Sequence, residues 1–262
     1  MRTALAAALL IAAGALAGCN DLPNRGRYPP PAVSTAESSR ETIVAALADP
    51  ARPAADRERD AARRAVETLA FTRVRPGQRV VDILPGGGYF TRLFARAAGA
   101  DGRVIAFLPN EAPAEYVAAI RRVSDDDATY DNVDLLQQPS PTLRPEAPVD
   151  LVFTAQNYHD LHAFGADVAA YNRAIFEALR PGGLYVIIDQ SAAAGTGATA
   201  ANTLHRIEES VVRREVEAAG FVLDAESAAL RNPADPRTAG VFDPAIRART
   251  DQFMLRFRKP AA

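Results

Sequence analysis

The sequence predicts an α/β fold in which a mostly parallel sheet lies between helices. The main observation is a short apolar run over residues 80–84, interrupted by Asp82, which leads through Pro85 and three glycines into a segment able to form a helix. Such a run is typical of a buried parallel strand, and a Gly-rich turn before a helix is typical of the βα unit of nucleotide-binding folds. The second observation is that apolar runs and helical segments alternate along the rest of the chain, as expected of a parallel sheet with crossover helices.

The individual elements follow from apolar periodicity and from the glycines and prolines that separate the segments. We expect strands over residues 79–84, 104–108, 133–137, 149–154, 184–189, 221–226 and 252–257. We expect helices over residues 38–48, 56–71, 89–98, 113–123, 167–179 and 203–219. The proline-rich segment 139–148 is expected to run over the surface. The acidic run 125–127 is interpreted as a solvated turn.

The glycine turn after the first strand is a candidate ligand site. Glycines let the backbone pass close to a ligand, and a helix that begins near Tyr89 offers free N–H groups to a small polar or anionic group. A turn of this kind is weak evidence alone, because glycine also serves purely steric needs there. The carboxylate of Asp82 is costly to bury unless it is hydrogen-bonded. It either lies close to a ligand or caps the turn through backbone N–H groups.

The bulk composition favours one domain and a small-molecule substrate. A chain of 262 residues, 48% of them apolar, can bury one large core. The formal net charge is −2 and no dense basic run occurs, so the sequence argues against nucleic acid as a substrate. It makes no prediction of the oligomeric state.

The N-terminus predicts export. Arg2 precedes an Ala/Leu-rich run over residues 4–17, which is short for a membrane span but typical of a signal-peptide core. The run ends in Leu16-Ala17-Gly18-Cys19, which resembles a bacterial lipobox; an incidental cysteine is the alternative. Cys19 is the only cysteine, so no disulfide can form within the chain. We therefore expect a lipoprotein of the bacterial cell envelope that faces the periplasm and is attached to the membrane through lipidated Cys19. The expected parts are a signal peptide over residues 1–18, a flexible tether over 19–37 and a folded domain over 38–262.

Several segments, in this order, resemble the class I S-adenosylmethionine-dependent methyltransferases. Besides the glycine turn, they are residues 74–79, 102–107, 148–153 and 179–189, and the resemblance extends over residues 56–259. More narrowly, four short motifs are similar to those of a group of exported bacterial predicted methyltransferases. They are Pro85–Tyr89, Asn157–Asp160, His205–Glu208 and Asp251–Phe253.

The resemblance implies a fold, a cofactor and an activity. The fold is the Rossmann-like three-layer sandwich of class I methyltransferases, with a mostly parallel seven-stranded sheet and one antiparallel strand. The activity is transfer of a methyl group from S-adenosylmethionine to an oxygen or nitrogen atom of a small molecule. The residues expected at the cofactor are Asp82, Pro85, Gly86, Gly87, Gly88, Tyr89, Glu111 and Asn157.

The same resemblance implies the catalytic residues. His159 is the expected base, with Asp160 or another carboxylate orienting its ring, although a histidine bonded into a structural turn is equally compatible with the sequence. Tyr158, His205 and Arg206 are expected to shape the acceptor site. Since His205 and Glu208 have i,i+3 spacing, they are predicted to share one face of the helix over 203–219.

The sequence also departs from the family pattern. Leu84 stands where the first glycine of the motif is usual, Leu108 stands where an acid usually binds the ribose, with Glu111 the nearest acid, and Gln138 replaces an acid near the adenine. S-adenosylmethionine is moreover made in the cytosol. These points leave two alternatives open, a non-catalytic ligand-binding protein and a metal-dependent hydrolase. Although no metal site is predicted, Asp160, Asp189, His159 and His205 are the candidate ligands in the second case.

Overall fold

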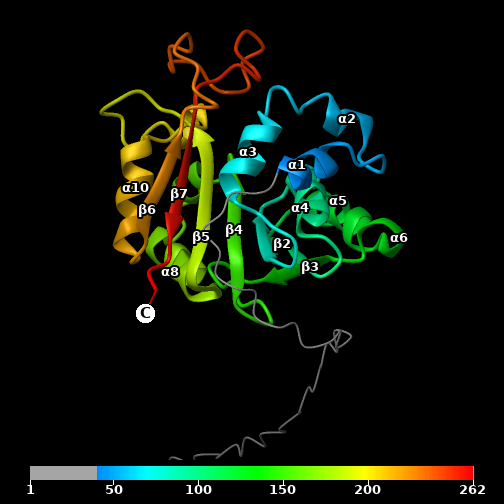
Figure 1. Ribbon diagram of the computed structural model, residues 1–262. Coiled ribbons are helices and arrows are strands. Elements are labelled where there is room, and N and C mark those ends of the chain that lie inside the picture. Colours follow the sequence, from blue (N-terminus) through cyan, green and yellow to red (C-terminus); the bar gives the residue numbers. More distant parts are fainter. Residues whose placement is uncertain (1–39, 262) are drawn as a thin grey trace, which may run out of the picture. The chain divides into compact units, whose positions relative to one another are not determined.

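The computed structural model describes residues 40–261, which form one α/β domain (Figure 1). The predicted signal peptide and tether, residues 1–37, lie outside the described residues. Within residues 40–261, no helix is both long enough and apolar enough to cross a membrane.

The domain is built on a seven-stranded sheet in the order β3-β2-β1-β4-β5-β7-β6. Strands β1 to β5 are parallel, and β7 pairs antiparallel with both β5 and β6. β7 is therefore the one reversed strand, and the prediction of a mostly parallel sheet with a single antiparallel strand is confirmed. The strands are β1 Arg79–Ile83, β2 Arg103–Pro109, β3 Val133–Gln138, β4 Val149–Ala155, β5 Leu179–Gln190, β6 Val222–Ser227 and β7 Gln252–Arg258.

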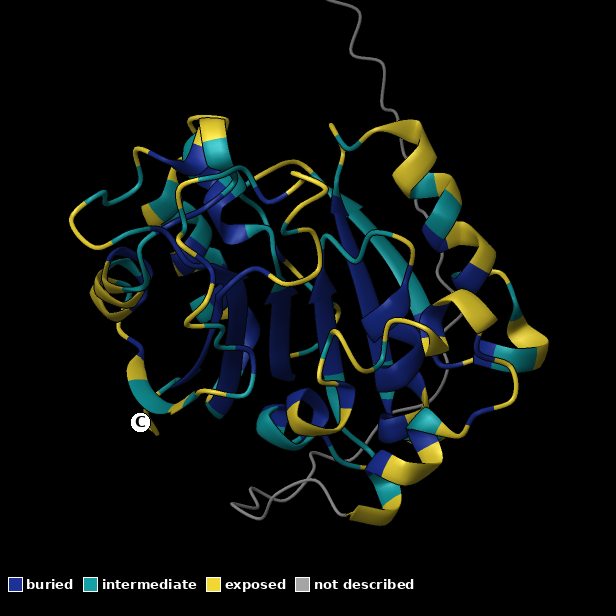
Figure 2. Cartoon of the chain, turned by 90° about the horizontal axis from the view of Figure 1, so that it is seen from above, coloured by how far each residue is buried: buried dark blue, intermediate teal, exposed yellow. Residues whose placement is uncertain are grey.

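Helices cover both faces of the sheet. The helices are α1 Arg40–Leu47, α2 Ala54–Arg57, α3 Ala65–Thr72, α4 Tyr89–Ala98, α5 Ala114–Ser124, α6 Asp127–Tyr130, α7 Tyr158–Ala163, α8 Val168–Ala178, α9 Ala201–Leu204 and α10 Glu209–Ala218. Successive strand residues point to opposite faces, so Val80 packs in the core beneath α1, α3 and α4, while Val81 packs in the core beneath α7, α8 and α10. Seen from above the strand ends, the buried strands run through the middle of the domain and exposed residues gather on the outer helices and loops (Figure 2).

The strand register brings the site-bearing turns together. Ile83, the last residue of β1, pairs with Phe107 of β2 and Thr154 of β4. The carboxyl ends of these parallel strands are therefore level, and the segments that follow β1 and β4 lie side by side. In such sheets ligands bind outside the carboxyl ends of the strands.

Two predicted helices are interrupted. The helix expected over 56–71 is divided into α2 and α3 by a series of turns, and Arg64 just before α3 has φ +44°. Asp56 in α2 and Asp60 in the turns that follow it pair with Arg92 and Arg52. Sequence periodicity detects an apolar face but not such long-range ion pairs.

The helix expected over 203–219 is also wrong in its first part. α9 ends at Leu204, His205 has φ +54°, and α10 begins only at Glu209. The backbone leaves the helix because Arg206 is drawn into the interior, where it pairs with Asp235. Two short helices, α6 and α7, fall outside the predicted ones. α6 begins at Asp127, the last residue of the acidic run interpreted as a turn, and α7 begins within the motif Asn157–Asp160.

Candidate active site

The glycine turn, Pro85–Gly88, joins β1 to α4. Gly86 and Gly88 have φ values of +57° and +82°, which glycine adopts without strain. Leu84, at the place of the missing first glycine, has φ +51° all the same. The backbone thus keeps the left-handed conformation there, at a cost of about 1 kcal/mol or more.

Part of this turn is open. A Cβ atom added at Gly86 or Gly87 would meet no protein atom within 4 Å. At Gly88, by contrast, it would lie 3.0 Å from the guanidinium of Arg92 and 3.1 Å from Val123. The first two glycines therefore border free space beside the start of α4, and the third is required by packing within the domain.

Asp82 is bonded inside the protein. Its side chain is buried and accepts a 2.7 Å hydrogen bond from the hydroxyl of Thr91 on α4. Burial raises the pKa of Asp82 to about 7, although the bonds from Thr91 and the charge of Arg63 act in the opposite direction. The observed partner of this carboxyl group is therefore Thr91 in the first turn of α4.

The segment around α2 and α3 covers the turn from one side. Tyr89 donates a 2.6 Å hydrogen bond to Asp60, which is also paired with the buried Arg52. The guanidinium of Arg63 lies 4.7 Å from the ring centre of Tyr89 and 5.2 Å from that of Phe90. Burial and the charge of a neighbouring arginine lower the pKa of Arg63 to about 10. Sequence analysis did not identify these arginines, since charged residues of a helical segment are usually solvated.

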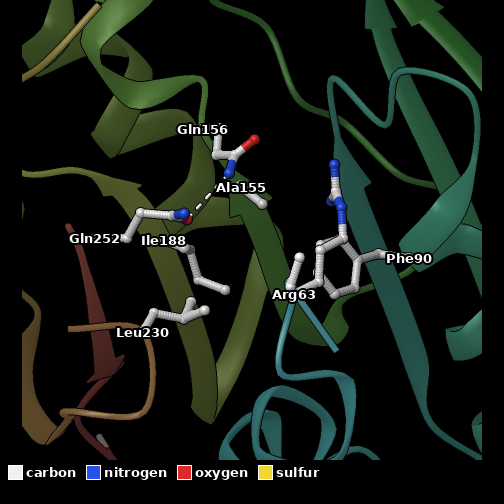
Figure 3. Close-up of a pocket in the computed structure, with 8 residues that line it drawn as sticks. Arg63, Phe90, Ala155, Gln156, Ile188, Leu230 and Gln252 are labelled. Atoms are coloured by element: carbon white, nitrogen blue, oxygen red, sulfur yellow. Dashed lines mark hydrogen bonds between the residues drawn. The ribbon is translucent and has the colours of Figure 1, made fainter. Parts of the chain in front are cut away.

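A small cavity of about 20 Å³ lies between this segment and the ends of the central strands. Arg63 and Phe90 form one side of it, and Gln156 and Gln252, which are hydrogen-bonded to each other at 3.0 Å, lie on the other (Figure 3). The volume suffices for about one water molecule.

Of the two other residues expected at the cofactor, Asn157 lies at the ends of β1 and β4, whereas Glu111 lies on the surface beyond β2. The side-chain amide of Asn157 lies 3.3 Å from the carbonyl oxygen of Leu84 and 3.4 Å from that of Ile83, so it links the end of β4 to the end of β1. Glu111 is exposed just beyond β2, whereas Leu108 is fully buried. The side chain of Gln138 makes two hydrogen bonds to the backbone of Arg144, and so it holds the following loop.

His159 and Asp189 form a buried pair at the ends of β4 and β5. Nδ1 of His159 lies 2.8 Å from Oδ1 of Asp189, and the backbone N–H of His159 donates to Oδ2 at 2.7 Å. The backbone N–H of Gln190 also donates to Asp189, whose side chain is fully buried. Of the two possibilities left open by the sequence, Asp160 or another carboxylate, the group that orients the ring through Nδ1 is another carboxylate, Asp189.

Asp160 instead lies at the other ring nitrogen. Its Oδ1 atom is 3.3 Å from Nε2 of His159. Burial acts to lower the pKa of His159, but the hydrogen bond and charge of Asp189, with the charge of Asp160, outweigh it and raise that pKa. Burial raises the pKa of Asp160 as well, against the charge of His159. One imidazole thus lies between two carboxyl groups.

The ring of His205 completes this cluster. Its centre lies 5.4 Å from that of His159 and 4.9 Å from that of Phe242, with edge-to-face geometry in both cases. Glu208 does not share a helix face with it, because the Glu208 carboxylate accepts hydrogen bonds from the backbone N–H groups of Gly195 and Gly197. The structure therefore joins His205 to His159 and separates it from Glu208.

Tyr158 and Arg206 are structural. The hydroxyl of Tyr158 is buried, accepts from Asn172 at 2.7 Å and lies 3.1 Å from Glu215. Arg206 is fully buried and makes two bonds of 2.9 and 3.2 Å to Asp235. Both were expected at the acceptor site, but their polar groups are used inside the domain. Residue type and motif position did not reveal which way these side chains turn.

Comparisons with known proteins identify the fold. No protein-family model and no curated protein matches the chain. Among solved structures, it is similar to an S-adenosylmethionine-dependent methyltransferase from Aquifex aeolicus, with 18% identity over 74% of this chain and 88% of the other, at a TM-score of 0.54. It is similar to the putative methyltransferase in complex with the Haloferax volcanii Trm112 activator, with 18% identity, coverages of 80% and 94% and a TM-score of 0.57.

A third similar structure has a different catalytic description. It is the 4+2 cyclase SpnF, with 18% identity, coverages of 80% and 82% and a TM-score of 0.55. Fold alone therefore does not specify the reaction. Together with the strand order and the glycine turn after β1, these similarities show that the chain has the class I methyltransferase fold.

Proposed function

We propose that this chain is an S-adenosylmethionine-dependent methyltransferase that acts on an oxygen or nitrogen atom of a small molecule in the cell envelope. The proposal rests on one juxtaposition at the carboxyl edge of the sheet. An open glycine turn follows β1, and a buried carboxylate–imidazole pair lies at the ends of β4 and β5, the next two strands in the sheet.

The residues at the turn fit the methionine end of the cofactor. Gly86 and Gly87 leave room for a ligand beside the N-terminus of α4. Arg63 has no ion pair within residues 40–261 and carries charge complementary to the cofactor carboxylate. The nucleoside end has fewer partners, since Glu111 is the nearest acid beyond β2 and Gln138 is engaged by the adjacent loop.

The cavity beside Arg63 is much smaller than a pocket for the whole cofactor. Pockets for ligands of this size usually measure about 300 Å³ or more, whereas the cavity beside Arg63 measures about 20 Å³. That cavity is therefore too small to hold the cofactor as it stands. We expect a dissociation constant in the micromolar range, which corresponds to a binding free energy of about −8 kcal/mol.

His159 is the proposed proton acceptor. When bound, S-adenosylmethionine supplies an electrophilic methyl group, and a protonated oxygen or nitrogen nucleophile needs a base. Asp189 accepts from Nδ1 of His159 and so leaves the lone pair on Nε2. The Nε2 atom takes the proton of the acceptor group, and the buried charge of Asp189 stabilises the imidazolium that results. Asp160, 3.3 Å from Nε2, interacts with the same proton.

Calorimetric titration of the full-length protein with S-adenosylmethionine and S-adenosylhomocysteine tests the cofactor. Micromolar binding of both supports methyl transfer. If neither compound binds at millimolar concentrations, S-adenosylmethionine is not the cofactor and the proposed methyl transfer is wrong.

The matched variants His159→Ala and His162→Ala test the base. His162 belongs to the same helix but bonds to Glu215, outside the cluster. We expect His159→Ala to reduce turnover by about 10²-fold or more with cofactor binding unchanged, and His162→Ala to retain turnover. Equal activity of the two variants would exclude His159 as the base.

A further inference from the structure

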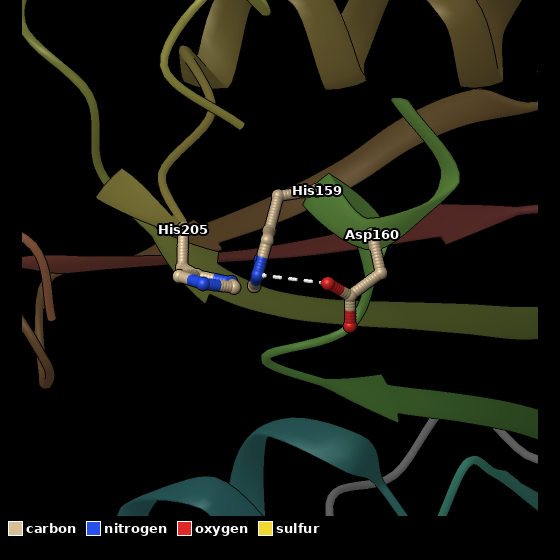
Figure 4. A group of neighbouring side chains, drawn as sticks. All are labelled: His159, Asp160 and His205. Carbon is tan, nitrogen blue, oxygen red and sulfur yellow. Dashed lines mark ion pairs between the residues drawn. The ribbon is translucent and has the colours of Figure 1, made fainter. Parts of the chain in front are cut away.

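We propose that His159, Asp160 and His205 bind a divalent transition-metal ion, Zn²⁺ in the first instance. Each offers one ligand atom, and the three atoms lie within 4.8 Å of one another. The side chains come from two separate segments, α7 and the junction between α9 and α10, and turn toward a common point (Figure 4). The ion would bind Nε2 of His159, the same atom that is proposed to take a proton during methyl transfer, so the two roles exclude each other while the ion is bound. The test of the metal site needs no cofactor.

The chemistry of the three groups matches Zn²⁺. Catalytic zinc sites commonly have three protein ligands, for example two imidazoles and one carboxylate, and leave further positions open. Imidazole nitrogen suits Zn²⁺ and its neighbours in the first transition row, whereas Mg²⁺ prefers six oxygen ligands. A site with two nitrogen ligands therefore favours a transition metal.

The distances allow a shared ion. Ligand atoms about 2.1 Å from one Zn²⁺ ion can be at most about 4.2 Å apart. Nε2 of His159 and Oδ1 of Asp160 are 3.3 Å apart, which corresponds to an angle of roughly 100° at the ion, close to the tetrahedral value. Ligand atoms of a tetrahedral Zn²⁺ site are about 3.4 Å apart. Since the whole group lies within 4.8 Å, His205 needs to approach by about 1.4 Å at most.

His205 is able to make that approach. It occupies the left-handed position between two helices, and in the described part of the chain its ring makes edge contacts with His159 and Phe242 but no hydrogen bond. A small rotation of the ring therefore breaks no polar interaction. Phe242 is itself 64% exposed, so it does not confine the ring tightly.

Asp189 supports the site from behind. Metal-bound histidine usually donates its second ring N–H to a carboxylate, which fixes the ring and raises its basicity. Nδ1 of His159 has this partner at 2.8 Å, and three donors hold the Asp189 carboxylate in place. Nε2 of His159 is consequently directed at Asp160 with its orientation already set.

The local charge also favours a cation. Within the described residues, the ion pairs of Asp160 and of Asp189 are both with His159, and neither carboxylate pairs with lysine or arginine. Arg206, next to His205 in the sequence, forms its ion pair with Asp235 instead. The carboxyl groups of Asp160 and Asp189 can carry negative charge, which a divalent ion offsets.

The direct test is titration of metal-free full-length protein with Zn²⁺ in competition with a chromophoric chelator. The Cys19→Ser background removes the only thiol, which is a competing zinc ligand. We expect one ion per chain, with affinity reduced at least about tenfold by His205→Ala and by Asp160→Asn. His162→Ala is the control and should bind as the parent does. Equal affinity in all variants, or no binding, would overturn the site, as would displacement of Zn²⁺ by Mg²⁺.

Nuclear magnetic resonance gives a second test that needs no substitution in the cluster. The chain has three histidines, so the ring nitrogen signals can all be assigned. Zn²⁺ should shift Nε2 of His159 and one ring nitrogen of His205 and leave His162 unchanged. Shifts confined to His162, or none, would contradict the proposal. Neither measurement involves S-adenosylmethionine, so the metal site can be confirmed or excluded whether or not the protein binds that cofactor.

Discussion

At the scale of single residues, the site combines features that the sequence predicts with others that it hides. Three of the four predicted catalytic residues, His159, Asp160 and His205, come together. Tyr158 does not, because its hydroxyl lies among buried partners. The sequence leaves the orienting carboxylate open and does not single out Asp189, since a residue 30 positions away along the chain gives no local signal of a hydrogen bond to His159.

The raised pKa of Asp82 predicts that the stability of the fold depends on pH. That pKa is about 7 in the folded protein, against an ordinary value of 3.8. Between these two pH values the folded state keeps the proton of Asp82, whereas the unfolded state loses it. The contribution of protonated Asp82 to the free energy of unfolding is therefore complete below about pH 4 and is lost as the pH rises through about 7. The full difference corresponds to about 4 kcal/mol at most.

The variant Asp82→Asn should remove this dependence, because the amide stays neutral and retains an oxygen to accept from Thr91. Urea unfolding between pH 4 and 8 measures it, and the variant should gain stability relative to the parent protein as the pH rises. Asp127→Asn, at an exposed position, is the control. Parallel profiles of Asp82→Asn and the parent would show that Asp82 is ionised in both states.

At the scale of elements, strand positions were predictable and two helices were not. α4 agrees with its predicted bounds, and most predicted strands lie within a few residues of the observed ones, because apolar runs and glycine or proline boundaries are local signals. β5 is the exception: it begins at Leu179, five residues before its predicted start, where a helix end and a turn were expected. The breaks at Arg64 and His205 depend instead on ion pairs with distant residues. The second break matters most for the site, since it directs His205 toward His159.

Arg206 is expected to hold the segment 232–250 against the end of β5. Besides its pair with Asp235, it donates to the carbonyl groups of Ser191 and Ala239 at 3.0 Å. Arg206→Met should lower the free energy of unfolding by about 3 kcal/mol or more, since Asp235 would remain buried without its partner. Denaturant titration measures the change.

Arg213→Met provides the comparison, because Arg213 pairs with Glu217 on the exposed surface of α10. Its effect should stay within about 0.5 kcal/mol. If the two variants lose equal stability, the interior pair contributes no more than a surface pair.

At the scale of the whole molecule, the fold class followed from the sequence because its signals repeat along the chain. Each βα unit carries its own apolar run and turn, and the observed order of seven strands agrees with the class I methyltransferase fold. The expected cofactor contacts are less predictable. They depend on how loops such as the one held by Gln138 close over the strand ends.

Attachment to the membrane is a prediction about the whole molecule. Cys19 ends the lipobox-like sequence, and several acyl chains on one residue give stable anchoring. Cys19→Ser should move the protein from the membrane fraction to the soluble fraction of the envelope, as followed by fractionation and immunoblotting. Gly26→Ser, within the predicted tether, should leave the protein in the membrane fraction. Retention of the Cys19→Ser protein in membranes would contradict lipid attachment at this residue.

The interior position of β7 has a consequence for biogenesis. Residues 252–258 lie between β5 and β6, so both neighbours keep unpaired edges until this strand is synthesised. During translation the domain therefore remains incompletely folded until β7 has emerged from the ribosome. Until then the open edges of β5 and β6 are the places where this fold is most exposed to edge-to-edge pairing with other chains.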